Sequence, residues 1–329
     1  MNKTSRRFHS PLAFGFSAFV AYKHSLGRRF HTEEKLFALF DRYLVEQRIT
    51  KIVQITPEVV DGFVASRPRH IPRSYNQLLG TIRRLFEWMV LTERLDTVPL
   101  RAKPRRNGTP SRPFLFDTAQ ARDLLVAASR LPDTPGVAMR GHTYEMIFAL
   151  LYALGLRVGE LTRLRGVDVD LQEKLLVIRE TKFGKSRYVP FGPRVEERLS
   201  RYLQKRQEVV GRLKPEHAVF TFSKDGYRQI RPKTISWTFH KLVFELHLNV
   251  PPGIRPPHLH CLRHSFAVAT LLRWYRNGIN PAERLLYLST FLGHVSPEST
   301  AVYLTITDEL LQAASKRYEH FAALNGVGS

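Results

Sequence analysis

The first hundred residues carry apolar side chains at the spacing of amphipathic helices. Apolar positions recur every three or four residues through 33–49 and through 74–95, which places them on one face of a helix. Between these segments, Thr56 and Pro57 are the residue types favoured at the N-cap and at the first position of a further helix. We therefore predict that residues 10–100 form a small all-helical domain.

An apolar run close to the N-terminus can be interpreted in two ways. It follows basic residues, as in a secretory signal, but Pro11 and Gly15 interrupt it and no clear small-residue cleavage site follows. With Phe16, Phe19 and Val20 at helical spacing, the run instead predicts an amphipathic first helix of the same domain.

The pattern changes after residue 115, where short runs rich in β-branched and aromatic residues stand between helical segments. Three such runs, at 174–180, 186–191 and 217–223, predict strands, and a turn separates the first two. We therefore predict a mostly helical α+β domain with a small antiparallel β-sheet over 115–329. Its predicted helices are 117–131, 143–154, 194–212, 234–247, 260–276, 281–291, 297–305 and 308–323.

The net charge narrows the class of partner. Lysine and arginine number 51 against 29 acidic residues, which gives +22 over 329 residues. An excess of this size favours a polyanion, and DNA, RNA and an anionic membrane surface all fit it. No run of about 18 apolar residues is present, so we expect no membrane-spanning segment. The single cysteine, Cys261, excludes an intramolecular disulfide and indicates a reducing, cytoplasmic environment.

Residues 101–114 separate the two predicted domains. The segment holds five basic residues, no acidic residue, three prolines and one glycine, a composition typical of an extended linker. Its charge would also allow it to follow a phosphate backbone. We therefore predict that its basic residues contact DNA: Arg101, Lys103, Arg105, Arg106 and Arg112.

Two stretches of the second domain place basic residues at turns. Arg157 follows a glycine that ends a predicted helix, and Glu160 lies three residues further on, where the two could also form a plain surface ion pair. Lys182 and Lys185 lie in the turn between two predicted strands, which can direct an ammonium group into a groove. Lysines are also common in solvated turns, so neither stretch decides the function alone.

A histidine-rich segment follows later in the chain. His260 and Arg263 are three residues apart and therefore share one face of a helix. The run from His258 to His264 also fits a metal-dependent phosphoesterase. Against a metal site, side chains at 260, 261 and 263 diverge on a helix, and no carboxylate lies close in the sequence.

A Leu-Gly-His sequence ends at His294, and Tyr303 follows nine residues later. Ser296 is a candidate N-cap for the helix that carries this tyrosine. A tyrosine on a helix is more often structural than reactive. A non-catalytic basic DNA-binding protein with Tyr303 in its core is therefore an alternative.

Taken in this order, the residues resemble the pattern of the tyrosine recombinase (phage integrase) family. That pattern is an arginine, a lysine in a β-turn, His-x-x-Arg, Leu-Gly-His, and a tyrosine nine residues after that histidine. The sequence places at these positions Arg157, Lys182, His260, Arg263, His294 and Tyr303. The neighbouring stretches GLRVGEL and RHSFAVATLL agree. The resemblance covers the second domain, whereas the first domain and the linker match the family's core-binding domain only in general form.

The resemblance implies a site-specific recombinase that cuts and rejoins DNA through a covalent 3′-phosphotyrosine, without metal or cofactor. Tyr303 would be the nucleophile, and Arg157 and Arg263 would meet the charge on the phosphoryl oxygens. Lys182, favoured over Lys185 by the alignment with the family turn, would protonate the leaving 5′-oxygen. The supporting roles would be His260 as base or orienting donor, His294 as donor to a phosphoryl oxygen, Glu160 as orienting partner of the arginines, and Lys185 as a DNA contact.

The resemblance also implies the partners. Recombinases of this family act on two double-stranded DNA partners with four protomers, so we expect a DNA-dependent homotetramer in which the C-terminal helix packs on a neighbouring protomer. Type IB topoisomerases share the chemistry, so DNA relaxation without strand exchange is an alternative within the same reaction class.

Overall fold

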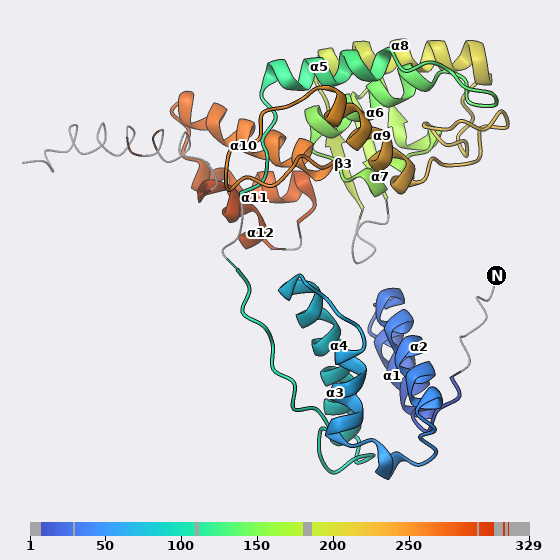
Figure 1. Cartoon of the computed structure of the whole chain (residues 1–329). Coiled ribbons are helices and arrows are strands. Elements are labelled where there is room, and N and C mark those ends of the chain that lie inside the picture. The colour runs from blue at the N-terminus through green and yellow to red at the C-terminus, as the bar shows by residue number, and fades with distance from the viewer. Residues whose placement is uncertain are drawn as a thin grey trace, which may run out of the picture. The chain divides into compact units, whose positions relative to one another are not determined.

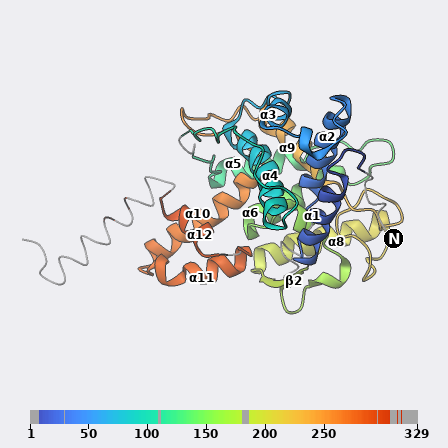
Figure 2. The same ribbon diagram turned by 90° about the horizontal axis from the view of Figure 1, so that it is seen from below.

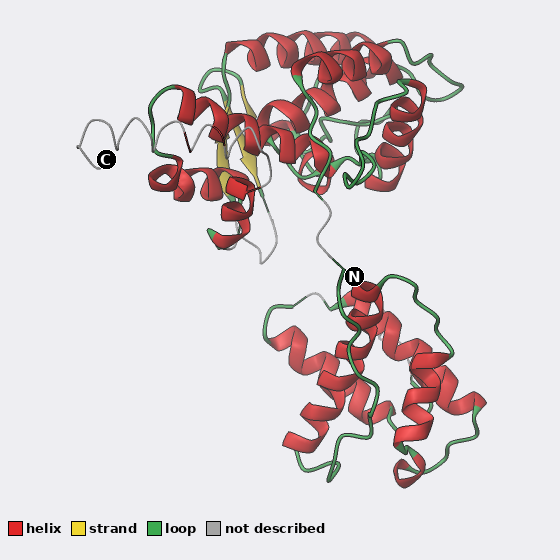
Figure 3. Ribbon diagram, turned by 60° about the vertical axis from the view of Figure 1, so that its left-hand side comes forward, coloured by secondary structure: helices red, strands yellow, loops and turns green. Residues whose placement is uncertain are grey.

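The computed structural model divides the chain into two compact units, Met1–Pro110 and Ser111–Ser329. It describes residues 8–28, 30–108, 112–179, 186–294, 296–305, 312 and 315. The described elements of the first unit are helical, and the strands belong to the second unit (Figures 1 and 3). Each unit builds a hydrophobic core of its own.

The first unit packs its helices around aromatic side chains. Its described elements are α1 (Ala13–Ser25), α2 (His31–Glu46), the 3-10 helix η1 (Ile52–Gln54), α3 (Pro57–Ala65) and α4 (Pro72–Leu91). Six phenylalanines are buried in the core: Phe16, Phe19, Phe37, Phe40, Phe63 and Phe86. Phe40 and Phe63 have ring centroids 4.6 Å apart, so α2 and α3 meet through aromatic contact. Thr56 stands at the N-cap of α3, as predicted.

The beginning of the predicted linker is held against the first unit. Asn76 in α4 accepts a hydrogen bond from the Arg105 amide at 2.7 Å and donates one to the Arg105 carbonyl at 2.8 Å. The Arg105 guanidinium lies 4.0 Å from the centroid of the Tyr75 ring, and Arg101 pairs with Glu58 at 2.5 Å. The chain therefore follows the surface of the first unit for several residues beyond the predicted end of that domain.

In the second unit, α6 (Arg140–Leu154) is the central helix. Ten of its residues are buried, because apolar side chains occur around the whole helix rather than on one face. Its neighbours are α5 (Thr118–Ser129), α7 (Val158–Thr162), α8 (Pro193–Val210) and α10 (His260–Arg276). Other described helices are α9 (Pro232–Glu245), α11 (Pro281–Leu292), α12 (Glu298–Ala301) and the 3-10 helix η4 (Val302–Thr305). In Figures 1 and 2, α10, α11 and α12 lie side by side at one end of the unit.

A small sheet lies beside these helices. After the 3-10 helix η2 (Gly166–Asp168), strands β1 (Val169–Asp170), β2 (Leu175–Ile178) and β3 (Arg187–Pro190) pair antiparallel in the order β1-β2-β3. In the register, Leu176 faces Val189, and both are fully buried. The mostly helical fold with a small antiparallel sheet, predicted from the sequence, is therefore confirmed for the described residues.

Two predicted elements differ from the structure. Residues 217–223 are not a strand: only Ala218 and Thr221 form isolated bridges, with Arg165 and Gln229. The run is apolar because residues 218–221 are continuously buried in the core, not because it alternates across a sheet.

The helix predicted over 297–305 is also divided. It is a short α-helix, α12, followed by the 3-10 helix η4, and its N-cap is Pro297 rather than Ser296. Beyond residue 305 only residues 312 and 315 are described, so the predicted helix over 308–323 and its packing on a neighbour lie outside the described residues.

Candidate active site

The turn between α6 and α7 presents Arg157. The helix ends at Gly155, whose φ of +59° is the left-handed conformation that favours glycine. A Cβ at Gly155 would lie 2.5 Å from the Phe266 ring and 2.9 Å from Leu292, so the close packing also requires glycine. Arg157 is the N-cap of α7, and its amide donates to Glu160 at 3.0 Å. The short helix α7 thus places arginine and carboxylate side by side.

Glu160 is a buried carboxylate shared by two arginines. Its Oε1 accepts from Nη1 of Arg157 at 2.8 Å and from Nη1 of Arg187 at 3.0 Å, and its Oε2 accepts from Nη2 of Arg187 at 2.9 Å. Burial by itself would raise the pKa of Glu160, but the hydrogen bonds and charges of the two arginines outweigh it and lower the pKa to about 2. Glu160 is therefore a fixed negative charge that orients both guanidinium groups.

Three consecutive carbonyls at the end of α11 accept hydrogen bonds from three arginines. The pairs are Arg187 Nε to the Phe291 carbonyl at 2.8 Å, Arg263 Nη2 to the Leu292 carbonyl at 2.7 Å and Arg157 Nη2 to the Gly293 carbonyl at 2.8 Å. The last carbonyls of a helix lack partners within it and carry the negative end of its dipole. The end of α11 therefore gathers three cations that are far apart in the sequence.

Arg263 is the most deeply buried of these three arginines, with 1% of its surface exposed. Its Nη1 donates to the Gly155 carbonyl at 2.6 Å, which adds a second anchor. Burial and the charge of Arg157 lower the pKa of Arg263 to about 10, so it stays protonated at neutral pH. Its buried Nε has no hydrogen-bond partner among the described residues. The guanidinium therefore keeps donor capacity that none of the described residues uses.

Tyr303 lies in η4 with its side chain turned into the protein. It is 3% exposed and belongs to a buried apolar cluster with residues of α10 and α11, among them Leu292. Its phenolic oxygen is 2.9 Å from Nδ1 of His264. Burial raises the pKa of the phenol, and the charges of Arg263 and Arg157 oppose that rise.

Two further histidines lie around this tyrosine. The ring of His260 meets the ring of His264 edge-on, with centroids 4.6 Å apart. The ring of His294 is nearly parallel to the Tyr303 ring, with centroids 6.3 Å apart, and its Nδ1 is 2.6 Å from Thr300 Oγ1. Burial, followed by the charges of nearby arginines, lowers the pKa of His294 to about 4. Desolvation and neighbouring cations also lower the pKa of His260, although its side chain is exposed. Both imidazoles are therefore neutral at pH 7.

Known proteins share both the sequence pattern and the fold. Residues 116–309 match the phage integrase family. The protein y4rB of Sinorhizobium fredii, named as an integrase/recombinase, is 31% identical over 306 residues, which cover 92% of this chain and 95% of y4rB. This chain belongs to the phage integrase family. The tyrosine recombinase XerD of Ralstonia nicotianae is 27% identical over 256 residues, which cover 78% of this chain and 76% of XerD.

Solved structures of integrases have the same fold. The Tn1549 transposon integrase in complex with transposon right end DNA aligns with a TM-score of 0.63 at 15% identity, over 94% of this chain and 99% of that chain. A lambda integrase tetramer bound to a Holliday junction aligns with a TM-score of 0.60 at 16% identity, over 87% of this chain and 78% of that chain. At this level of identity the likeness is one of fold.

In this member of the integrase family, the structure brings most of the predicted catalytic and supporting residues into one cluster. The residues brought together are Arg157, Glu160, His260, Arg263, His294 and Tyr303. Lys182 and Lys185 lie outside the described residues. The catalytic roles of all of these residues stay predictions.

The basic linker residues have varied surroundings. The four basic residues at 101–106 are all exposed. Arg101 and Arg105 also contact their own unit, through Glu58 and Tyr75 respectively. Arg112 belongs to the second unit, where its carbonyl accepts from the Arg255 amide at 3.0 Å. The five basic residues therefore do not all belong to a free linker, because some are held by one unit or the other. Their contacts with DNA stay a prediction.

Two residues of the cluster were not selected from the sequence. Arg187 could have been found from strand alternation, because it is two positions from the fully buried Val189 and so faces inward. A buried arginine requires a partner, which is Glu160. His264 does not match the family pattern, because only His260 has the His-x-x-Arg spacing to Arg263. Its contact with Tyr303 depends on a residue 39 positions away, and no local pattern reveals that.

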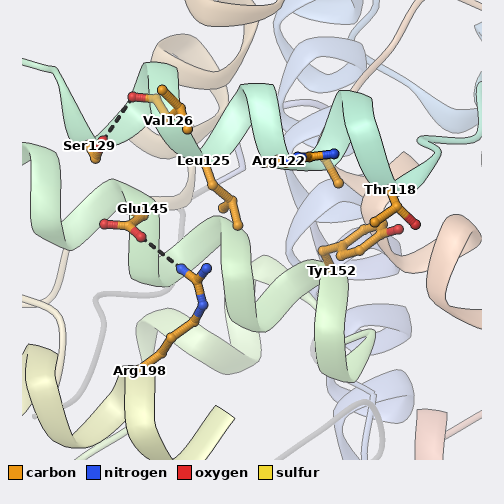
Figure 4. A pocket seen from close by; sticks show the side chains of 9 residues that line it. Thr118, Arg122, Leu125, Val126, Ser129, Glu145, Tyr152 and Arg198 are labelled. Atoms are coloured by element: carbon orange, nitrogen blue, oxygen red, sulfur yellow. Dashed lines mark hydrogen bonds and ion pairs between the residues drawn. The ribbon is translucent and has the colours of Figure 1, made fainter. Parts of the chain in front are cut away.

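A pocket of about 320 Å³ lies between α5, α6 and α8 (Figure 4). None of the residues that line it belongs to the cluster around Arg157 and Tyr303. Arg198 and Glu145 face each other across it and pair at 2.8 Å, and Thr118 lies next to Tyr152. Glu145 and Arg198 neutralise each other, and the third charged group of the lining, Arg122, is exposed, so nothing marks the pocket as a reactive centre.

The metal-dependent alternative is not favoured by the local geometry. Nδ1 of His258 lies 2.8 Å from the Cys261 thiol, while Nδ1 of His264 lies next to Tyr303. Among the residues that the structure describes, no three His, Cys, Asp or Glu side chains are grouped so that they could hold a metal ion.

In the same described part of the chain, every helix is too short or too polar to cross a lipid bilayer.

Proposed function

We propose that this protein is a site-specific DNA recombinase that breaks and rejoins strands through a 3′-phosphotyrosine at Tyr303. The observation that carries the proposal is the grouping of two arginines with a buried tyrosine at the end of α11. A phosphodiester is a stable anion, and displacement of one of its oxygens increases the charge on the others. Donors that are fixed beforehand stabilise that charge without reorganising during the reaction.

Arg157 and Arg263 would bind the scissile phosphate. Each uses some of its five N–H donors on protein carbonyls or Glu160, which fixes its plane and leaves other donors for phosphoryl oxygens. Glu160 and Arg187 would hold Arg157 in place and would not touch the substrate. His294 would donate to a phosphoryl oxygen, and His260, at the exposed start of α10, would orient the same phosphate or act as a base.

Tyr303 would attack the phosphorus, and the 5′-oxygen would leave. Lys182 would protonate the leaving oxygen as general acid, with Lys185 as a DNA contact in the same turn. The covalent intermediate conserves the phosphoester bond for rejoining. The reaction as proposed uses no metal or cofactor, because arginine and lysine side chains supply the cations.

The rest of the chain would hold the DNA. The net charge of +22 suits a duplex, and we propose that residues 10–100 are a core-binding domain, residues 101–114 a basic connection and residues 115–329 the catalytic domain. The lambda integrase structure contains a tetramer on a Holliday junction, which supports a homotetramer on two DNA partners here. A protein that recombines bacterial or phage DNA would work in the cytoplasm.

Covalent trapping on a nicked suicide substrate tests the proposal. The wild type should form a protein–DNA adduct in the presence of EDTA, whereas Tyr303→Phe should form none and bind DNA with nearly unchanged affinity. Tyr287→Phe is the matched control, because that tyrosine is 67% exposed on the neighbouring helix α11. An adduct in Tyr303→Phe would assign the nucleophile elsewhere, and loss of the wild-type adduct in EDTA would favour the metal-dependent alternative.

A further inference from the structure

His264 is the histidine that touches the phenolic oxygen of Tyr303. It lies in the second turn of α10, immediately after the buried Arg263, and its Nδ1 is 2.9 Å from the phenol. The ring centroids of His264 and Tyr303 are 5.5 Å apart at an angle of 58°, so the imidazole meets the hydroxyl rather than stacking on the ring. The contact therefore has the geometry of a hydrogen bond to the reacting atom.

The neighbouring histidines have different contacts. His294 lies parallel to the Tyr303 ring and directs its Nδ1 to Thr300. His260 meets the His264 ring at 4.6 Å, and the centroid of His258 is 6.4 Å from it. Among the described histidines, His264 is thus the one for which the structure gives a hydrogen bond with the nucleophile.

The surroundings of His264 keep its imidazole neutral. Burial, followed by the charges of His258 and Arg263, lowers its pKa to about 4. A neutral imidazole has one nitrogen that accepts a hydrogen bond, whereas an imidazolium has none. When a phosphate anion binds at the arginines it offsets part of their positive charge, so the imidazole becomes a stronger base at the moment when the substrate is present.

We propose that His264 is a catalytic residue that accepts the phenolic proton of Tyr303 through Nδ1 during strand cleavage. The inference rests on the proposed recombinase function. In the forward step the Tyr303 Oη–P bond forms, the P–O5′ bond breaks, the phenolic proton passes to His264 and Lys182 gives a proton to the 5′-oxygen. In rejoining, the 5′-hydroxyl attacks the phosphotyrosine, and the two protons return to Tyr303 and Lys182.

The asparagine variant separates proton acceptance from positioning. In His264→Asn, the side-chain amide oxygen can occupy the place of Nδ1 and accept the same hydrogen bond, but it cannot take the proton. We expect cleavage to fall by ~10²–10⁴-fold, the usual contribution of a general base, with DNA affinity unchanged. His247→Asn is the control, since it makes the same substitution at an exposed position of the second unit.

Two chemical rescues then identify which proton is affected. A fluorinated tyrosine at position 303 ionises more readily, so it should restore much of the rate of His264→Asn and little of the rate of Lys182→Ala. A substrate with a 5′-bridging sulfur has a better leaving group, so it should rescue Lys182→Ala and leave His264→Asn slow. This crossed pattern is not expected from a variant that is merely misfolded.

Either of two results overturns the inference. One is near wild-type cleavage by His264→Asn, which would reduce the contact to positioning. The other is an equal effect of the fluorinated tyrosine in the wild type and in His264→Asn. Failure of the recombinase function itself would be distinct, because the wild type would then form no adduct at Tyr303 with the nicked substrate.

Discussion

At the scale of single residues, the site depends on one buried carboxylate. Glu160 holds Arg157 and Arg187 at once, and both arginines also donate to carbonyls at the end of α11. Removing the carboxylate would leave Arg187, with 10% of its side chain exposed, as a buried charge without its counterion. The ion pairs at this position therefore contribute to the fold of the site as well as to its chemistry.

The depressed pKa of Glu160 predicts how its contribution to stability depends on pH. Because its folded pKa is about 2 against an ordinary 4.5, the stabilisation is present above about pH 4.5 and is lost as the pH falls toward 2. The shift corresponds to roughly 3 kcal/mol. The free energy of unfolding of Glu160→Gln should therefore fall below that of the wild type at pH 7, and the difference should narrow by pH 3. Urea titrations at the two pH values measure it, and a constant difference would contradict the pKa assignment.

Arg187 should act on catalysis without touching DNA. Lysine in its place keeps the charge but cannot make the paired contacts with Glu160 and the Nε contact with the Phe291 carbonyl. We expect Arg187→Lys to slow cleavage by on the order of 10–10²-fold, because a displaced Arg157 meets the phosphate poorly, and to leave DNA affinity unchanged. Arg198→Lys, at the ion pair in Figure 4, is the control. A weakened DNA affinity with normal cleavage would assign Arg187 to DNA contact instead.

At the scale of elements, the end of α11 explains the glycine of the Leu-Gly-His sequence. Gly293 has a φ of +66°, and a Cβ there would lie 2.7 Å from Nη1 of Arg187. Gly278, after the end of α10, has a φ of +72° and open space around it. The two glycines therefore share the backbone requirement, but only Gly293 has the close contact.

Alanine at each glycine should separate these two effects. Gly293→Ala and Gly278→Ala should both lower stability by about 1–2 kcal/mol through the left-handed conformation. Only Gly293→Ala should also reduce cleavage, because its methyl group displaces Arg187. Thermal unfolding and suicide-substrate cleavage of the pair provide the comparison. Equal losses of cleavage in both variants would show that backbone strain alone is responsible.

The elements also show what the sequence can and cannot predict. Long segments with helical spacing, such as 143–154 and 260–276, became helices because burying one or more apolar faces is a local property of the pattern. The apolar run 217–223 is not a strand, because its side chains pack in the core without a paired neighbouring strand. The sequence pattern shows that the run is buried but not what it packs against. The ordered motif predicted the identity of the site residues but not the contacts between them. Contacts such as Arg157 with Gly293 join residues 136 positions apart, so they required the fold.

At the scale of the whole molecule, the chain consists of two cores connected by a basic segment. The first unit carries part of that segment on its own surface, through Asn76, Glu58 and Tyr75. The part of the segment that is free to act as a tether between the two units therefore begins after residue 105. This tether is shorter than one that begins at residue 101. If both units bind the same duplex, tether length sets the effective concentration of one unit once the other is bound.

Release of the segment should therefore weaken binding by the whole chain. Asn76→Ala removes both hydrogen bonds to Arg105 without altering any basic residue. A doubled tether length lowers the effective concentration about threefold. Because Arg105 keeps its contacts with Tyr75 and the Arg69 carbonyl, we expect a loss of affinity of at most that order. Because no charge is lost, the dependence of binding on salt concentration should stay the same. Titrations of a fluorescent duplex at several salt concentrations give both quantities, with the exposed Asn249→Ala as control. A reduced salt dependence would mean that the anchored segment contacts phosphates directly, and that its position on the first unit orders it for that contact.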